Sequence, residues 1–118
     1  MHKNLEVWKK SMDLVVSVYS MTAGFPPEEK YGITSQMRRA AVSVPSNIAE
    51  GCARNSTKEL LQFLYVAQGS LSELETQYQI AIRLKFEKQP DPMVECEIKT
   101  IGKMLNSLIK RIHSRQNP

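Results

Sequence analysis

The segment that decides the fold is Gln36–Gly51, which reads QMRRAAVSVPSNIAEG. Its apolar spacing is typical of a helix, yet Pro45 stands near its middle. A proline there removes one backbone hydrogen bond and crowds the carbonyl of Ala41, so we expect a helix that is kinked at this point. Polar residues follow one flank at steps of three and four, namely Gln36, Arg39, Ser43, Asn47 and Glu50. Serine and asparagine are poor helix formers, so this flank is expected to meet protein or a ligand rather than water alone.

Two stop signals separate this helix from an earlier one. An amphipathic stretch covers residues 4–23 and ends at Gly24 and the Pro26-Pro27 pair. The proline pair is expected to open a short helical turn. The helix that contains Gln36–Gly51 is then predicted over residues 34–51, with Thr34 or Ser35 as its cap.

Two later helices carry clearer start signals. Ser56 and Glu59 fit a capping box, which predicts a helix over residues 57–87. Asp91 and Pro92 are typical of an N-cap and a first helical position, which predicts a helix over residues 92–113. Residues 114–118 are expected to form a frayed tail.

Apolar residues recur at helical spacing in every stretch. The expected core line of the first helix is Leu5, Trp8, Met12, Val15, Tyr19 and Thr22. No strand-like alternation appears between the helices, and the connections are short. The pattern predicts one all-α domain over residues 1–118, an antiparallel up-down-up-down four-helix bundle whose second helix is kinked at Pro45.

Composition excludes several classes of protein. The 118 residues are 42% hydrophobic and 24% charged, as in soluble globular domains, and the net charge is +4. Neither an apolar run of about 18 residues nor a secretory signal is present, so we expect no membrane partner. Cys52 and Cys96 are isolated, which favours a reducing, cytoplasmic location.

Residues suited to catalysis or metal binding are scarce. No Glu-x-x-His pair exists for a di-iron site, and the two cysteines are too far apart in sequence to suggest a zinc site. No internal histidine is available to activate a serine. Chemistry by Glu50 or Glu73 with Arg39 is the one enzymatic arrangement that stays open. We therefore expect no metal, no cofactor and no catalytic residue, and hence not an enzyme.

Basic residues gather towards the C-terminus and near the junction of the second and third helices. No acid follows Glu97, whereas five bases do. Such an end suits an anionic partner, but it also suits the negative end of a helix dipole. If the partner is nucleic acid, the contacts would be made chiefly to phosphates. The predicted contact residues are Arg38, Arg54, Lys58, Lys103, Lys110 and Arg111.

The polar flank has two interpretations. In the structural one, its residues bond across to a similar flank of the third helix that includes Ser70, Glu73 and Gln77. In the functional one, the flank binds a ligand or nucleic acid. The structural network is assigned to Gln36, Arg39, Ser43, Asn47, Glu50, Ser70 and Glu73.

The chain has more apolar surface than a monomeric bundle requires. A second apolar line, Leu14, Val18 and Met21, follows the first helix, and the third helix is apolar around much of its circumference. Part of this widens the core-facing stripe. The remainder predicts burial against further copies of the chain.

Several motifs carry a resemblance to a known family. They are Trp8-Lys9-Lys10, Phe25-Pro26, Tyr31-Gly32-Ile33-Thr34-Ser35-Gln36, Arg38-Arg39-Ala40, Ser43-Val44-Pro45-Ser46-Asn47-Ile48-Ala49-Glu50-Gly51 and Gly69-Ser70-Leu71. Across about residues 3–112 the chain resembles the four-helix-bundle family that includes proteins encoded within intervening sequences of bacterial 23S ribosomal RNA genes. The resemblance implies a ring-like homopentamer. The family is also similar to the accessory protein of diversity-generating retroelements, a basic pentameric barrel that binds nucleic acid.

The function expected from these observations is that of a non-enzymatic accessory factor. It would form a homo-oligomer, a pentamer if the resemblance holds, and bind structured RNA or other nucleic acid through its basic surface. The alternative is an assembly or scaffold module that docks another protein and binds no nucleic acid.

Overall fold

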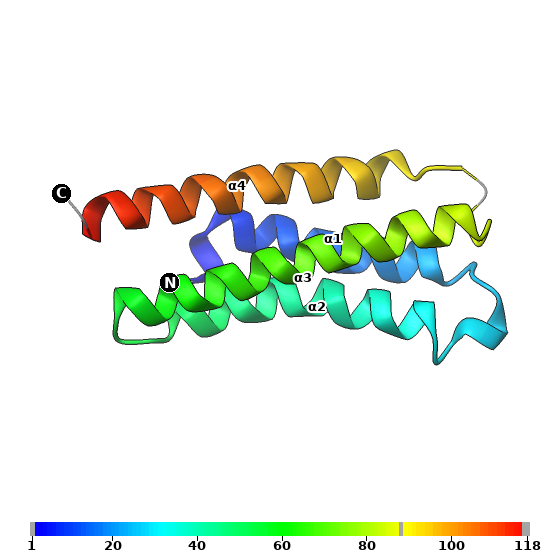
Figure 1. Cartoon of the computed structure of the whole chain (residues 1–118), viewed down its shortest axis with the longest axis horizontal. Helices are drawn as coiled ribbons and strands as arrows, with labels where there is room; N and C mark the ends of the chain where they lie inside the picture. Colours follow the sequence, from blue (N-terminus) through cyan, green and yellow to red (C-terminus); the bar gives the residue numbers. More distant parts are fainter. Residues whose placement is uncertain (1, 88, 117–118) are drawn as a thin grey trace.

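Four helices form the protein in the computed structural model, which describes residues 2–87 and 89–116. They are α1 Glu6–Thr22, α2 Ile33–Cys52, α3 Thr57–Arg83 and α4 Pro92–Gln116, with short 3-10 turns η1 His2–Asn4 and η2 Pro27–Glu29. Successive helices run in opposite directions along the long axis (Figure 1) of a molecule that measures 49 × 23 × 21 Å. The described residues contain no strand, so the predicted all-α four-helix fold is confirmed.

Each helix packs against two neighbours. α1 contacts α2 and α4, and α3 contacts the same two helices, with the closest association between α2 and α3. The fully buried side chains come from all four helices and include Leu14, Met37, Ile48, Leu64 and Leu105. One continuous apolar core therefore runs between the helices, and the polar ends of the long side chains lie on the outside.

The core line predicted for the first helix is confirmed only in part, since Thr22 is buried and Leu5, Trp8 and Val15 are half-buried against the core. Met12 and Tyr19 are exposed, whereas the residues expected to be secondary, Leu14, Val18 and Met21, are buried. Ser11 joins the buried row because its hydroxyl donates to the Val7 carbonyl at 2.7 Å, which satisfies it within its own helix. The helix is therefore rotated relative to the expectation, and part of its apolar stripe faces outward.

The start of α2 differs from the prediction. The helix begins at Ile33, and neither Thr34 nor Ser35 caps it. The Glu29 carboxylate in the preceding η2 turn accepts a hydrogen bond from the Ile33 N–H at 3.3 Å. A side chain from outside the expected capping position therefore satisfies this helix end, because the η2 turn folds back against it.

Pro45 is buried inside α2, which continues through it from Ile33 to Cys52. The neighbouring Asn47 amide donates to the Ser43 carbonyl at 2.8 Å and to the Ser43 hydroxyl at 2.9 Å. These bonds bind the two turns around the proline together. The kink itself stays a prediction.

The starts of α3 and α4 follow the sequence closely. The Ser56 hydroxyl accepts from the Glu59 N–H at 3.1 Å, as a capping serine does. The Asp91 carboxylate accepts from the N–H groups of Met93 and Val94 at 3.1 and 3.2 Å. Both predicted N-caps are confirmed.

The ends of these helices differ from the prediction in opposite directions. α3 stops at Arg83 rather than residue 87, because Lys85 adopts a left-handed backbone with φ 64°. The N–H groups of Lys85 and Phe86 then donate to the carbonyls of Ile82 and Ala81, in the Schellman pattern. α4 continues to Gln116, beyond the expected end at residue 113, and the rest of the predicted tail lies outside the described residues.

Candidate nucleic-acid interface

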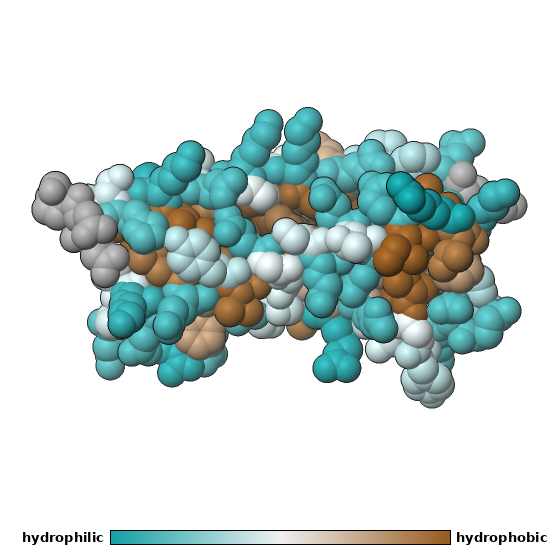
Figure 2. Space-filling model, viewed as in Figure 1, coloured by the Kyte–Doolittle hydropathy of each residue, from teal (hydrophilic) through white to brown (hydrophobic). Residues whose placement is uncertain are grey.

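The outer face of α4 carries a row of basic side chains. Lys99, Lys103 and Lys110 lie four and seven residues apart, which places them within about 40° of one another around the helix. All three are exposed, as is Arg111 one position further, and none forms an ion pair with another described residue. Figure 2 shows hydrophilic side chains over α4, with hydrophobic surface visible between α4 and α3. These charges are available to an anionic partner.

A groove lies beside this row, between α3 and α4. Its volume is about 590 Å³, and Lys99 and Lys103 line its α4 side. Tyr65, Gln68 and Gly69 line the α3 side. A second hollow of about 360 Å³ lies on the other side of α4, where Lys103 and Arg111 approach the start of α1. Lys103 therefore lies on the outer side of α4 between the two hollows and borders both of them.

Arg38 does not join this surface. Its Nε donates to the Thr22 hydroxyl at 2.8 Å, and its guanidinium also bonds to the Tyr19 carbonyl at 3.3 Å. The guanidinium lies 4.5 Å from the centre of the Tyr19 ring. These contacts satisfy carbonyl and hydroxyl groups in the last turn of α1, where a positive charge is also favourable to the helix dipole. The arrangement gives Arg38 a structural role in joining α1 to α2.

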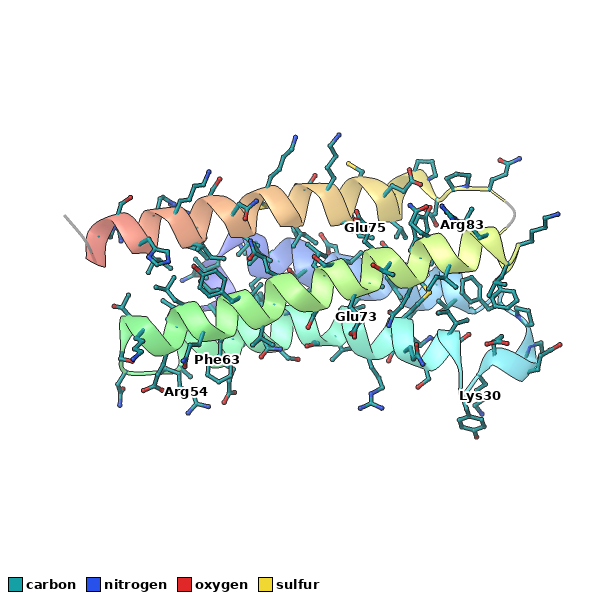
Figure 3. The ribbon with its side chains drawn as sticks, viewed as in Figure 1. Lys30, Arg54, Phe63, Glu73, Glu75 and Arg83 are labelled. Carbon is teal, nitrogen blue, oxygen red and sulfur yellow. The ribbon has the colours of Figure 1, made fainter. Side chains whose placement is uncertain are left out.

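Arg54 and Lys58 lie at the turn between α2 and α3. Arg54 forms an ion pair with Glu50 and covers the Phe63 ring at 4.9 Å (Figure 3). Lys58 is exposed in the first turn of α3. Arg115 of α4 lines a hollow with Thr57, so the basic end of α4 approaches this turn. Four of the six predicted contacts, Lys58, Lys103, Lys110 and Arg111, thus stay uncommitted to other groups among the described residues.

The polar flank of α2 meets α3 through only some of its members. The hydroxyls of Ser43 and Ser70 are 2.7 Å apart, and Asn47 supports Ser43 from the next turn. Glu50 bonds within α2 and its following turn, to Arg54, rather than across to α3. The bonds that cross between the two helices here are therefore those of the serines.

The remaining members surround an open hollow. Gln36, Arg39 and Glu73 border a volume of about 360 Å³ between α2 and α3, and no ion pair joins Arg39 to Glu73. Glu73 points to the α2 side of α3, whereas Glu75 lies on the side of α4 (Figure 3). Gln77 is 8% exposed, and its side-chain oxygen has no hydrogen-bond partner among the described residues. The structural interpretation, in which the polar flank bonds across to the third helix, therefore does not extend to Arg39 and Glu73 within the protomer.

An apolar face covers α1 and α2 on another side of the bundle. Met12, Tyr19 and Val42 are exposed there, and Val16 is 70% exposed. A hollow of about 360 Å³ among them is lined by Trp8, Met12, Val15, Val42, Pro45 and Ala49, with His2 and Ser46. The outward part of the α1 stripe therefore continues onto α2 as one surface.

The described residues offer little to other kinds of chemistry. They contain no group of three or more His, Cys, Asp or Glu side chains that could hold a metal ion. Burial raises the pKa of the Cys52 thiol, which disfavours the reactive thiolate. None of the helices formed by these residues has the length and apolar character to cross a bilayer.

The family can now be assigned. The family model for 23S rRNA-intervening sequence proteins matches residues 3–107. The chain belongs to this family. None of the curated proteins matches it.

One solved structure is similar to this chain in its fold. It is the crystal structure of a protein of unknown function from the S23 ribosomal protein family of Bacteroides thetaiotaomicron VPI-5482. The two chains are 24% identical, and the match covers 88% of this chain and 98% of the other with a TM-score of 0.73. At this identity the likeness supports the bundle fold, and it agrees with the family assignment.

Two residues outside the predicted contact set line the groove between α3 and α4 of this family member, namely Lys99 and Tyr65. Lys99 shares the row of Lys103, and its position four residues earlier was a sufficient signal. Tyr65 is not among the predicted contacts, because nothing local in the sequence shows that its ring lies at a groove between two helices. The structure brings Lys99, Tyr65 and Lys103 to one groove and leaves Arg38 away from it.

Proposed function

We propose that the protein is a non-enzymatic homo-oligomer that binds nucleic acid, with structured RNA as the preferred class, through the outer face of α4. The observation that carries this proposal is the exposed row of Lys99, Lys103 and Lys110 with Arg111 beside it. No acidic residue follows Glu97 on this helix, so α4 itself places no negative charge within the row. The family name refers to intervening sequences of 23S rRNA, which makes RNA the first ligand to test.

Self-association would strengthen such binding. Each protomer has a net charge of +4, so several copies around an axis present a field that attracts a polyanion from all their α4 faces. The apolar face of α1 and α2 supports association, because an exposed surface that includes Met12 and Val42 is stabilised when a second copy covers it. The family resemblance favours five copies, and the two isolated cysteines favour a cytoplasmic location.

The second candidate function is a scaffold that docks a different protein. The same apolar face favours it, since this surface offers no charge to a nucleic acid. In that case α4 would be a solvated basic helix whose lysines serve the helix dipole. The two functions predict different effects of charge reversal on α4: the first predicts a loss of affinity for nucleic acid, and the second predicts no such loss.

Reversing three charges on α4 tests the nucleic-acid proposal. The variant Lys103→Glu, Lys110→Glu, Arg111→Glu is expected to bind labelled structured RNA at least about 100-fold more weakly at low salt. The slope of log affinity against log salt should also become shallower, by about 0.7 to 0.9 for each phosphate that is no longer neutralised. Fluorescence anisotropy at several salt concentrations measures both. The bonds within the core are untouched, so the melting temperature and the oligomer should stay the same.

A matched control separates this site from general charge. The variant Lys3→Glu, Lys9→Glu, Lys10→Glu changes the net charge equally but lies on the N-terminal turn and α1. It should lose much less affinity. Equal losses in both variants would mean that binding is diffuse, and no binding by the wild-type protein at low salt would leave the scaffold function.

A second prediction concerns the apolar face. Val42→Asp places a charge where another copy is expected to pack, so light scattering should show a shift from oligomer to monomer. Tyr31→Asp is the control, because Tyr31 is exposed in the connection before α2 and does not line this face. A wild-type protein that is already monomeric at micromolar concentration would overturn the association.

A further inference from the structure

The groove between α3 and α4 has two chemically different walls. The α4 wall is basic, with Lys99 and Lys103. The α3 wall is uncharged over Tyr65, Gln68, Gly69 and Ser72. The acid that lines it, Glu75, lies towards the Lys99 end (Figure 3). One wall therefore suits phosphates and the other suits bases, and the acid limits the favourable part to the half that contains Tyr65.

Tyr65 is held in place at this end of the groove. Its side chain is 47% exposed, and its hydroxyl lies 2.8 Å from the Nε2 atom of His113 on α4. The two rings are 6.3 Å apart, so His113 fixes the tyrosine from one side and leaves it accessible from another. An exposed aromatic ring beside lysines is what single-stranded nucleic acid uses as a stacking platform.

The middle of the groove offers hydrogen-bonding groups. The Gln68 amide donates to the Asn106 carbonyl oxygen across the groove. This bond orients both side chains, and it leaves the Gln68 oxygen and the Asn106 amide free to pair with the edge of a base. Unpaired bases expose these edges, whereas paired bases do not.

Two glycines keep the groove open. A Cβ atom added at Gly69 would meet nothing within 4 Å, and one added at Gly102 would lie 3.6 Å from a Leu71 methyl. Packing within the protomer therefore requires neither glycine, although glycine weakens the interior of a helix. Their effect on this surface is to let another molecule approach the two backbones closely.

We infer that this groove binds an unpaired RNA strand, with one base stacked on Tyr65 and the adjacent phosphates on Lys103 and Lys110. The inference rests on the proposed function and adds the class of substrate, which is a loop or single strand rather than a continuous duplex. Within the part of the groove away from Glu75, the lysine row from residue 103 to residue 110 is about 10 Å long, which matches about three nucleotides of a helically stacked strand at about 3.4 Å each.

The test compares ligands and variants under one salt condition. The probes are a fluorescein-labelled RNA hairpin with an unpaired loop, the loop sequence alone, and a blunt duplex of the same length. The wild-type protein should bind the first two more tightly than the duplex. Tyr65→Ala should lower affinity for the loop sequence about tenfold, whereas Tyr65→Phe keeps the ring and should stay within about twofold of wild type.

Two further variants separate stacking from loss of structure. Tyr31→Ala is the matched control, since Tyr31 is 87% exposed and lies outside the groove, and its affinity should not change. Gly69→Leu fills the groove from an open position and should weaken binding to the loop sequence without lowering the melting temperature. A 2-aminopurine in the loop should be quenched by wild-type protein and not by Tyr65→Ala.

The inference and the proposed function fail in different ways. If the wild-type protein binds none of the three probes, the proposed function is wrong and the inference falls with it. If it binds RNA, and α4 charge reversal removes that binding, the function stands. The inference about the groove is then wrong if the protein prefers the duplex, or if the Tyr65→Ala and Gly69→Leu variants bind the loop sequence as tightly as wild type.

Discussion

Replacing Tyr78 by alanine should lower the free energy of unfolding by about 3–5 kcal/mol, the range for a large aromatic side chain removed from a core. Tyr78 is the largest of the fully buried side chains. Its hydroxyl also accepts from the Asp91 N–H at 2.7 Å and donates to the Glu95 carboxylate at 3.1 Å. The ring therefore fills the core from α3, while the hydroxyl holds the start of α4. Urea denaturation at fixed protein concentration measures the loss.

Tyr78→Phe separates the ring from the hydroxyl. It should cost about 1–3 kcal/mol, because the Asp91 N–H loses its partner in a partly buried site. If Tyr78→Phe is as harmful as Tyr78→Ala, the hydroxyl rather than packing dominates. If it costs nothing, water replaces the hydroxyl at the start of α4.

The same variant alters the response to alkaline pH. Burial raises the pKa of the Tyr78 phenol to about 12 from its ordinary 10, and the hydrogen bond to Glu95 adds to the rise while the Asp91 N–H opposes it. The unfolded chain therefore loses this proton at lower pH than the folded protein does. The resulting stability is complete below about pH 10 and is lost as the pH rises towards 12. The difference in stability between wild type and Tyr78→Phe should shrink across that window.

Substituting Gly51 by alanine should destabilise the protein by up to about 2 kcal/mol net. An added Cβ would lie 3.0 Å from the Phe63 Cβ and 3.2 Å from the Leu60 carbonyl oxygen. The backbone oxygen cannot rotate away, so α2 and α3 must shift apart at this contact. This overpacking costs about 1–3 kcal/mol, and the better helix propensity of alanine returns at most about 1 kcal/mol.

Gly69→Ala is the matched control for Gly51→Ala. Both glycines lie in helices, but the space around the Gly69 position is open. Alanine there should raise stability by about 0.5–1 kcal/mol. Thermal or urea unfolding of the pair should therefore give changes of opposite sign, and changes of the same sign would show that the contact at Gly51 is not limiting.

The sequence predicted the helices and their starts well where the signal was local. Ser56 and Asp91 cap helices because each needs only the next few backbone N–H groups, all within one turn. The end of α3 was predicted too late, since Lys85 carries no local mark of a residue with positive φ. The start of α2 was assigned to the wrong residues, because Glu29 reaches it from a separate turn.

The residues of the candidate site also fall into those that a local pattern predicts and those that depend on contacts far apart in sequence. The row on α4 follows from helical spacing, so Lys103, Lys110 and Arg111 were predicted from the sequence. Arg38 has the same chemistry, but its partners on α1 lie sixteen and nineteen residues away in sequence. Tyr65 was missed because a groove exists only once α4 lies beside α3.

By itself the sequence determined that there are four helices, that each is amphipathic, and that α4 carries a charged row. These features depend on the spacing of residues within one helix. Only the tertiary structure decided which side of α1 enters the core. Its apolar stripe is wide, so more than one rotation buries similar area, and the choice falls to details such as Ser11 bonding to its own backbone. The packing of the helices also created the groove between α3 and α4, and it placed Arg38 against the last turn of α1. In both cases residues that are far apart in sequence set the environment of a side chain.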